Sequence, residues 1–207
     1  MLDMKQGTAE WHAARCGLIT ASKISVVMSK GRSSAPSATR ATYMAQLAAE
    51  RLTGKPADGF TNAAMEWGTE TEPQARAEYT MRTGLMIEEV GFVPHPSISN
   101  SGASPDGLAG EDGLVEIKCP NTATHIDTLL SGKVPTKYIT QMQWQMLCCE
   151  RKWCDFVSFD NRLPEHLQLF VQEVEFDPEY AAMLEKEVVL FLTELDNKVA
   201  KLKEKYE

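Results

Sequence analysis

The sequence lacks any long apolar run. A helix that spans a bilayer needs roughly 18 or more consecutive apolar residues, and polar or charged residues interrupt every stretch of that length in this chain. The first residues, MLDMKQGTAEW, also lack the apolar segment of a secretory signal peptide. The sequence therefore predicts no membrane partner and a cytoplasmic location.

A surplus of positive charge is missing as well. The chain carries 21 Lys and Arg residues against 29 Asp and Glu residues, which gives a net charge of −8. A surface that binds polyanions in general shows an excess of basic residues, so the net charge argues against this class of protein. An enzyme that acts on nucleic acid is not excluded, because carboxylates can gather at a metal site while a few basic residues line one groove.

The cysteines do not form a recognisable set. They number five, an odd count, and no two of them have the Cys-x-x-Cys spacing. Cys148 and Cys149 are adjacent on a predicted helix, where their side chains point about 100° apart. This pattern argues against a disulfide framework, a zinc knuckle and an iron–sulfur cluster. We expect reduced, mostly buried thiols.

What is present is the composition of a globular protein. Hydrophobic residues make up 43% of the 207 residues and charged residues 24%, and this length fits a single domain covering residues 1–207. Periodicity and capping residues predict helices at about 8–15, 20–28, 37–54, 62–83, 122–131, 136–150 and from 177 onward. Strand patterns occupy 85–94, two short pieces within 101–109, 114–119, 153–159 and 169–176. This order predicts an α/β fold in which helices flank a mixed central sheet, with an N-terminal helical part and a long C-terminal helix.

The segment SPDGLAGEDGLVEIKCP, residues 104–120, carries the candidate chemistry. Alternate residues of a strand share a face, so Glu116 and Lys118 point to one side while Val115 and Ile117 point into the core. Asp106 lies at a turn before the neighbouring strand, which brings its carboxylate beside Glu116. Two carboxylates next to a lysine suit a hard cation such as Mg²⁺, and a bound water could then become a nucleophile. An exposed strand face with an incidental Glu–Lys pair is the alternative that this pattern leaves open.

The segment resembles the PD-(D/E)xK nucleases, and among them the phage lambda exonuclease family of viral recombination nucleases. The resemblance extends from about Trp11 to Phe159, with its motifs in matching order. They are WHAAR (11–15) with GLITAS (17–22), WG (67–68) with Glu72, SPDGL (104–108), and LVEIKCP (114–120) with Gln141 downstream. The resemblance implies a restriction-endonuclease-like fold with a mixed central sheet flanked by helices.

The resemblance also implies a metal site. Asp106, Glu116 and the helix-borne Glu72 match carboxylates that hold divalent metal, and the backbone carbonyl of Ile117 would be a further ligand. The implied cofactor is Mg²⁺, or Mn²⁺ in its place, with two ions per active site. Without this resemblance, Glu72 would be interpreted as a solvated residue on a helix.

Two further residues match family positions at the catalytic centre. Lys118 matches a lysine that orients or activates the attacking water and stabilises charge on the phosphate. Gln141 matches a glutamine near the active site, although a polar helix face is its alternative. Broader relatives carry a tyrosine four residues later, where this chain has Gln145, and this departure leaves the role of Gln141 less defined.

The N-terminal motifs imply contacts with a DNA end. Arg15 and Ser22 match a pocket for a terminal 5′ phosphate, with Trp11 in the same block; a surface arginine and a plain helix cap are the alternatives. Arg32, in a Ser-rich loop, matches an arginine that reaches the DNA groove. Met65 falls where the family places an apolar wedge against the end base pair, although a core methionine would show the same spacing.

The implied activity is a Mg²⁺-dependent deoxyribonuclease that digests one strand of linear double-stranded DNA in the 5′-to-3′ direction from a 5′-phosphorylated end. It would leave a 3′ overhang for recombination by strand annealing. The family further implies a homotrimeric ring, a single-strand annealing protein as partner, and a phage or prophage origin in a bacterial cytoplasm. The alternatives are another PD-(D/E)xK DNA nuclease, either end-processing or endonucleolytic, and a non-catalytic module that binds DNA ends.

Overall fold

The structure, a computed structural model, describes residues 4–31, 37–57 and 63–206. The α-helices are α1 (Ala9–Ala14), α2 (Ile24–Val27), α3 (Ala38–Thr53), α4 (Ala63–Thr83), α5 (Thr122–Ser131), α6 (Thr136–Cys149) and α7 (Pro178–Tyr206). Two 3₁₀ helices are η1 (Ala21–Lys23) and η2 (Glu165–Leu167). The strands are β1 (Ile19–Thr20), β2 (Ile87–Glu88), β3 (Val93–Pro94), β4 (Ser101–Ala103), β5 (Gly107–Ala109), β6 (Gly113–Lys118), β7 (Trp153–Phe159) and β8 (Leu169–Glu175).

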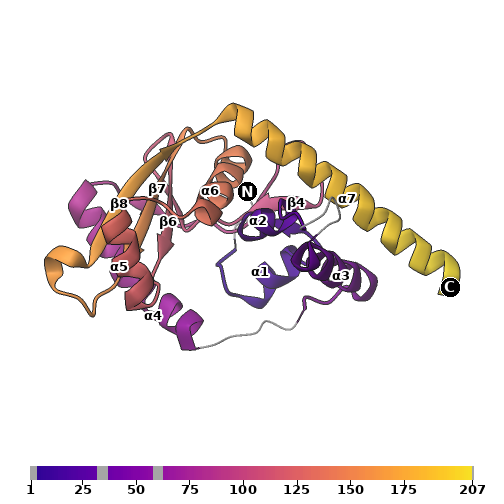
Figure 1. The fold of residues 1–207 in the computed structure, drawn as a ribbon, viewed down its shortest axis with the longest axis horizontal. Coiled ribbons are helices and arrows are strands. Elements are labelled where there is room, and N and C mark those ends of the chain that lie inside the picture. Colours follow the sequence, from indigo (N-terminus) through magenta and orange to yellow (C-terminus); the bar gives the residue numbers. More distant parts are fainter. Residues whose placement is uncertain (1–3, 32–36, 58–62, 207) are drawn as a thin grey trace.

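The larger sheet has five strands in the order β2-β5-β6-β7-β8. Strands β6 and β7 pair in parallel, and α5 and α6 form the crossover between them, while the other neighbours pair antiparallel. This mixed sheet with its helices confirms the predicted α/β class (Figure 1). The smaller sheet, in the order β1-β4-β3, joins the N-terminal part to the middle of the chain.

The two faces of the larger sheet are covered by different helices. On one face, Ala75 and Tyr79 of α4 pack against Val115 and Ile117 of β6. On the other face, Met142 and Met146 of α6 pack against a cluster that includes Leu114 of β6. Because helices cover both faces of the sheet, most side chains of β6 are apolar, and Glu116 and Lys118 are the polar exceptions.

Local sequence signals account for several helix boundaries. The Thr8 side chain accepts a hydrogen bond from the Trp11 backbone N–H at the start of α1, and the Ser37 side chain accepts one from Arg40 at the start of α3. Gly54 ends α3 in the left-handed conformation, with φ +65°. The sequence predicted each of these residues as a cap or a stop.

Helix α7 packs over α2, α3 and α6 with the first part of its length. An apolar stripe at helical spacing is buried from Leu184 through Val188 and Phe191 to Leu195, all with no exposed surface, and Val199 still packs against the same core. The last turns of the helix extend away from the other elements (Figure 1). None of the helices in the described ranges is both long and apolar enough to cross a bilayer.

One predicted strand differs from the structure. Residues 85–94 were expected to form one strand, but β2 pairs with β5 of the larger sheet while β3 pairs with β4 of the smaller one. The chain changes sheets between them, and this depends on tertiary partners that local sequence does not reveal. Pro73 lies inside the continuous helix α4, so no new helix begins at this residue.

Candidate active site

A short hairpin brings Asp106 to Glu116. Strands β5 and β6 pair antiparallel with Gly107 opposite Val115, so the residue before β5 reaches the second half of β6. The Ile117 backbone N–H donates a hydrogen bond of 2.7 Å to Oδ2 of Asp106. The Pro-Asp-Gly turn thus ties one acid to the strand that carries the other.

Glu116 lies on the face of β6 that α6 covers, and its side chain is fully buried. Gln141 donates its amide to Oε1 of this carboxylate at 2.6 Å, and Gln145 donates to Oε2 at 2.6 Å. The Lys118 ammonium forms an ion pair with Oε1. Residues 116 and 118 therefore share a face, as strand alternation predicts.

The third acid reaches the site from α4. Oε1 of Glu72 accepts a 2.6 Å bond from Arg76, one helical turn later. The Arg76 guanidinium also donates to the backbone carbonyl of Asp106 at 2.5 Å. Arg76 thus holds α4 against the turn that presents Asp106.

The charges of these groups depend strongly on one another. Burial, and then repulsion from Glu116, raise the pKa of Asp106 to about 8. Burial would lower the pKa of Lys118, but the facing carboxylates of Glu116 and Asp106 outweigh it and raise this pKa well above its usual range. Beside these two carboxylates Lys118 is therefore held as an ammonium.

The donor set suits a hard divalent cation. Asp106, Glu116 and Glu72 supply carboxylate oxygens, which Mg²⁺ prefers, and repulsion from Glu116 and Glu72 adds to the effect of burial in raising the pKa of Asp106. Across the described residues, no three His, Cys, Asp or Glu side chains already converge as a metal-holding group. In this arrangement Glu72 is turned to Arg76, and Glu116 to Lys118 and two amides.

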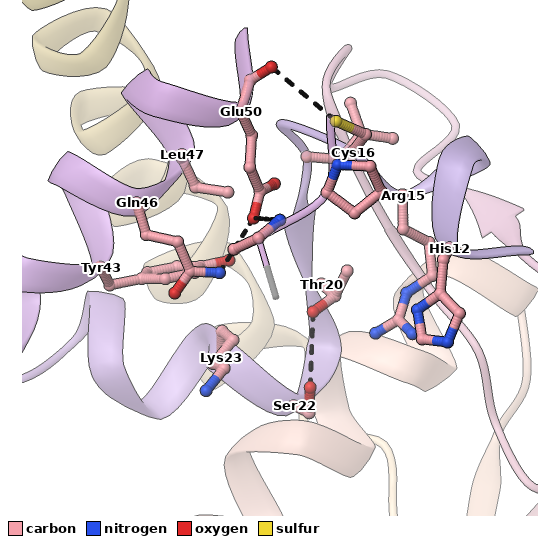
Figure 2. A pocket seen from close by; sticks show the side chains of 13 residues that line it. His12, Arg15, Cys16, Thr20, Ser22, Lys23, Tyr43, Gln46, Leu47 and Glu50 are labelled. Carbon is pink, nitrogen blue, oxygen red and sulfur yellow. Dashed lines mark hydrogen bonds between the residues drawn. The ribbon is translucent and has the colours of Figure 1, made fainter. Parts of the chain in front are cut away.

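A pocket of about 170 Å³ lies beside α1 and is lined by Arg15, Ser22 and Lys23 among others. In Figure 2 Lys23 and Arg15 lie on either side of Ser22, and Glu50, which also lines the pocket, lies above them. The Glu50 carboxylate accepts bonds from the Gly17 backbone N–H at 2.7 Å and from Gln46 at 2.9 Å. The Gly17 backbone and the Gln46 side chain thus hold the Glu50 carboxylate in the wall of this pocket.

Arg15 connects this pocket to the acids. It lines both the pocket and a cleft of about 730 Å³ that Glu72 and Asp106 also line. Its guanidinium stacks on the Trp11 ring at 3.7 Å from the centroid, and the indole N–H of Trp11 donates to Ser104 at 3.0 Å. Burial lowers the pKa of Arg15 to about 10, so the group is still cationic at neutral pH. Trp11 therefore serves as a platform between the basic pocket and the turn of Asp106.

Two of the predicted DNA-contacting residues cannot be placed. Arg32 and the side chain of Met65 lie outside the described part of the chain. Conversely, the sequence analysis did not identify Arg76 as a site residue, and it described Gln145 only as a departure from the family pattern. Both lie four residues from a predicted site residue on the same helix, Glu72 and Gln141 respectively. This spacing places them on the same helix face, and it is the signal that could have found them.

Comparisons with known proteins agree with the fold and the motifs. Residues 10–152 match the YqaJ-like viral recombinase domain. The crystal structure of LHK-Exo in complex with dAMP is 51% identical, with a TM-score of 0.90, and the match covers 96% of this chain and 97% of that one. The structure of the alkaline exonuclease LHK-Exo from Laribacter hongkongensis has the same identity and coverage, with a TM-score of 0.89.

A phage-related exonuclease from Haemophilus somnus 129PT shares the fold at 15% identity, with a TM-score of 0.71 over 89% of this chain and 96% of that one. No curated protein sequence matches the chain. The family match covers more than half of the chain, and the structural match at 51% identity spans almost all of it. The chain therefore belongs to the YqaJ-like viral recombinase family and is a DNA nuclease of the lambda exonuclease-like type.

Proposed function

We propose that this nuclease is a Mg²⁺-dependent exonuclease that digests one strand of linear double-stranded DNA from a 5′-phosphorylated end and leaves a 3′ overhang. The observation that carries the proposal is the position of Arg15, which lines both the basic pocket and the cleft of Asp106 and Glu72. A terminal phosphate bound by Arg15 would place the next phosphodiester toward the acids. The bound dAMP of LHK-Exo, a 5′ mononucleotide, belongs to the product class that this reaction releases.

The metal site that we propose consists of the carboxylates of Asp106, Glu116 and Glu72 with the backbone carbonyl of Ile117. Mg²⁺ is the expected ion, with Mn²⁺ as a substitute, and two ions are expected per site. Bound there, such ions supply a water of lowered pKa and stabilise the charge on the leaving 3′ oxygen. The buried position of Glu116 restricts water around this ligand, which strengthens its interaction with a cation.

The side chains around the acids have separable roles in this proposal. Lys118 forms an ion pair with Glu116, and in this proposal its ammonium stabilises negative charge on the phosphate and orients the attacking water. Gln141 fixes one oxygen of Glu116. Arg15, with Ser22 and Lys23, supplies donors and positive charge for the terminal phosphate.

The assembly and the partner are also proposals. A homotrimeric ring around the duplex would keep the enzyme on its substrate, and a single-strand annealing protein would take up the 3′ overhang. A phage-derived recombination enzyme of this kind would act in a bacterial cytoplasm. Analytical ultracentrifugation should give three times the 23.0 kDa chain mass, and a monomer would contradict the ring.

The activity is tested with linear and covalently closed circular duplexes, each incubated with Mg²⁺ or with a chelator. We expect mononucleotides from the linear duplex with Mg²⁺, no product with the chelator, and intact circles in both cases. The Lys118→Ala variant is the control for contaminating nuclease. Cleavage of closed circles, or digestion that persists in the chelator, would overturn the proposal.

A further inference from the structure

The Glu116 carboxylate is held by two glutamines of one helix. Gln141 and Gln145 lie one turn apart on α6, and each donates its amide to a different oxygen at 2.6 Å. The terminal torsion of a glutamate is broad, so a single donor leaves the carboxylate plane free to rotate. Donors on both oxygens fix the plane.

The two oxygens of Glu116 differ in how much of their acceptor capacity is used. Oε1 accepts from Gln141 and pairs with Lys118, whereas Oε2 accepts from Gln145 alone among the described residues. An ionised carboxylate has about four lone-pair sites, two on each oxygen. The oxygen that Gln145 holds is therefore the one with a lone pair still available for a cation.

The Gln145 side chain is only partly satisfied by its bond to Glu116. The residue is fully buried, and its own carbonyl oxygen, Oε1, has no hydrogen-bond partner within the described ranges. An unpaired buried acceptor costs free energy. Turning the amide over would not remove the cost, because Oε1 would then face the Glu116 oxygen and two acceptors would repel.

Gln143, two residues earlier on the same helix, forms hydrogen bonds that only join secondary-structure elements. Its amide donates to the Glu175 carbonyl at 2.7 Å, and its own carbonyl oxygen accepts from the Asp177 backbone N–H at 2.9 Å. Both of its polar ends thus join α6 to the β8–α7 connection. Gln143 is buried like Gln145, so it provides a matched control.

We propose that Gln145 is a positioning residue for metal binding: it holds Oε2 of Glu116 in the orientation that a divalent cation requires. The proposal rests on the assignment of Glu116 as a metal ligand in the proposed function. Residues that orient ligands in this way usually change metal affinity by 10- to 100-fold when they are replaced. Gln145 stands where broader relatives carry a tyrosine, and in this chain its amide reaches the carboxylate directly.

The test is a calorimetric titration of the DNA-free protein with Mn²⁺ alone. We expect Gln145→Met, which keeps the side-chain length but lacks a donor, to raise the Mn²⁺ dissociation constant by about 10- to 100-fold. Gln143→Met should lower the melting temperature and leave this constant within about twofold of the wild type, because its bonds lie outside the acidic site. The Mg²⁺ concentration that gives half-maximal digestion should rise in Gln145→Met and stay unchanged in Gln143→Met.

Wild-type Mn²⁺ affinity in a folded Gln145→Met protein would overturn the positioning role while leaving the proposed function intact. A wild-type protein that digests DNA without binding Mn²⁺ or Mg²⁺ would overturn the metal assignment and this proposal together. If the circular dichroism of Gln145→Met shows an unfolded protein, Gln145→Asn replaces it. That variant keeps the amide but is one methylene shorter, and it should also weaken Mn²⁺ binding.

Discussion

Replacing Arg15 by methionine removes a guanidinium that lies between the basic pocket and the acidic cleft. Methionine keeps an unbranched side chain but lacks the guanidinium that stacks on Trp11, so the change deletes the charge, the donors and this stacking contact. The Nε of Arg15 is buried with no hydrogen-bond partner within the described chain, which leaves this donor for a ligand. The variant therefore separates recognition of the terminal phosphate from the rest of the site.

The size of the effect follows from the bond that is lost. A hydrogen bond to a charged group contributes about 1.5–3 kcal/mol, and each 1.4 kcal/mol corresponds to about a tenfold change in a rate or binding ratio. The kcat/KM for 5′-phosphorylated duplex should thus fall by roughly 10- to 150-fold. The kcat/KM for 5′-hydroxyl duplex should change by less than about threefold, since this end offers no phosphate for Arg15 to bind.

The assay measures mononucleotide release from the two duplexes at pH 8, where Arg15 is cationic. The wild-type enzyme should therefore prefer the phosphorylated ends under these conditions. Lys186→Met, which removes an exposed charge from α7, is the control for net charge. If Arg15→Met keeps the wild-type preference, the pocket does not bind the 5′ phosphate.

Three other substitutions test separate parts of the structure. Lys118→Ala should abolish measurable digestion while duplex binding in a gel-shift assay persists, and residual cleavage near the wild-type rate would refute its role in stabilising charge. Gly107→Ala should cost about 1–3 kcal/mol of unfolding free energy in urea, because the added Cβ would lie 2.1 Å from Cγ2 of Ile87; unchanged stability would show that β2 adapts freely. Asp160→Asn should cost about 1.5–3 kcal/mol at pH 7. Asp160 is fully buried, and the bonds from Arg162 outweigh burial and lower its pKa, so this difference should persist above pH 4 and shrink as the pH falls below it. A difference independent of pH would refute the ionic explanation.

Local chemistry made the hairpin of the site predictable from the sequence. The Pro-Asp-Gly turn, followed by the alternation of Val115, Glu116 and Ile117, requires only neighbouring strands, and the structure pairs Gly107 with Val115 as this geometry demands. The C-terminal helix could be predicted equally well from the sequence, because its apolar stripe repeats at helical spacing. Both features depend on periodicity and turn chemistry within a few residues.

Partners that meet through tertiary contacts could not be predicted in the same way. Residues 85–94 have a strand-like composition, but β2 and β3 join different sheets, and no local pattern marks the change. Gln145 lies in a run of polar and apolar residues that fits any half-buried helix. Its contact with Glu116 depends on which face of β6 is covered by α6, and the sequence does not determine this.

The polarity of digestion tests the proposed function most directly. A linear duplex with a phosphate on every 5′ end is labelled with one dye near its 5′ termini and a second dye near its 3′ termini, and both dyes are followed over time with Mg²⁺. We predict early release of the 5′ dye in mononucleotides while the 3′ dye stays on long strands that become sensitive to a single-strand-specific nuclease. Early loss of the 3′ dye, with the 5′ dye retained on long strands, would contradict the assignment of the Arg15 pocket and the reaction built on it.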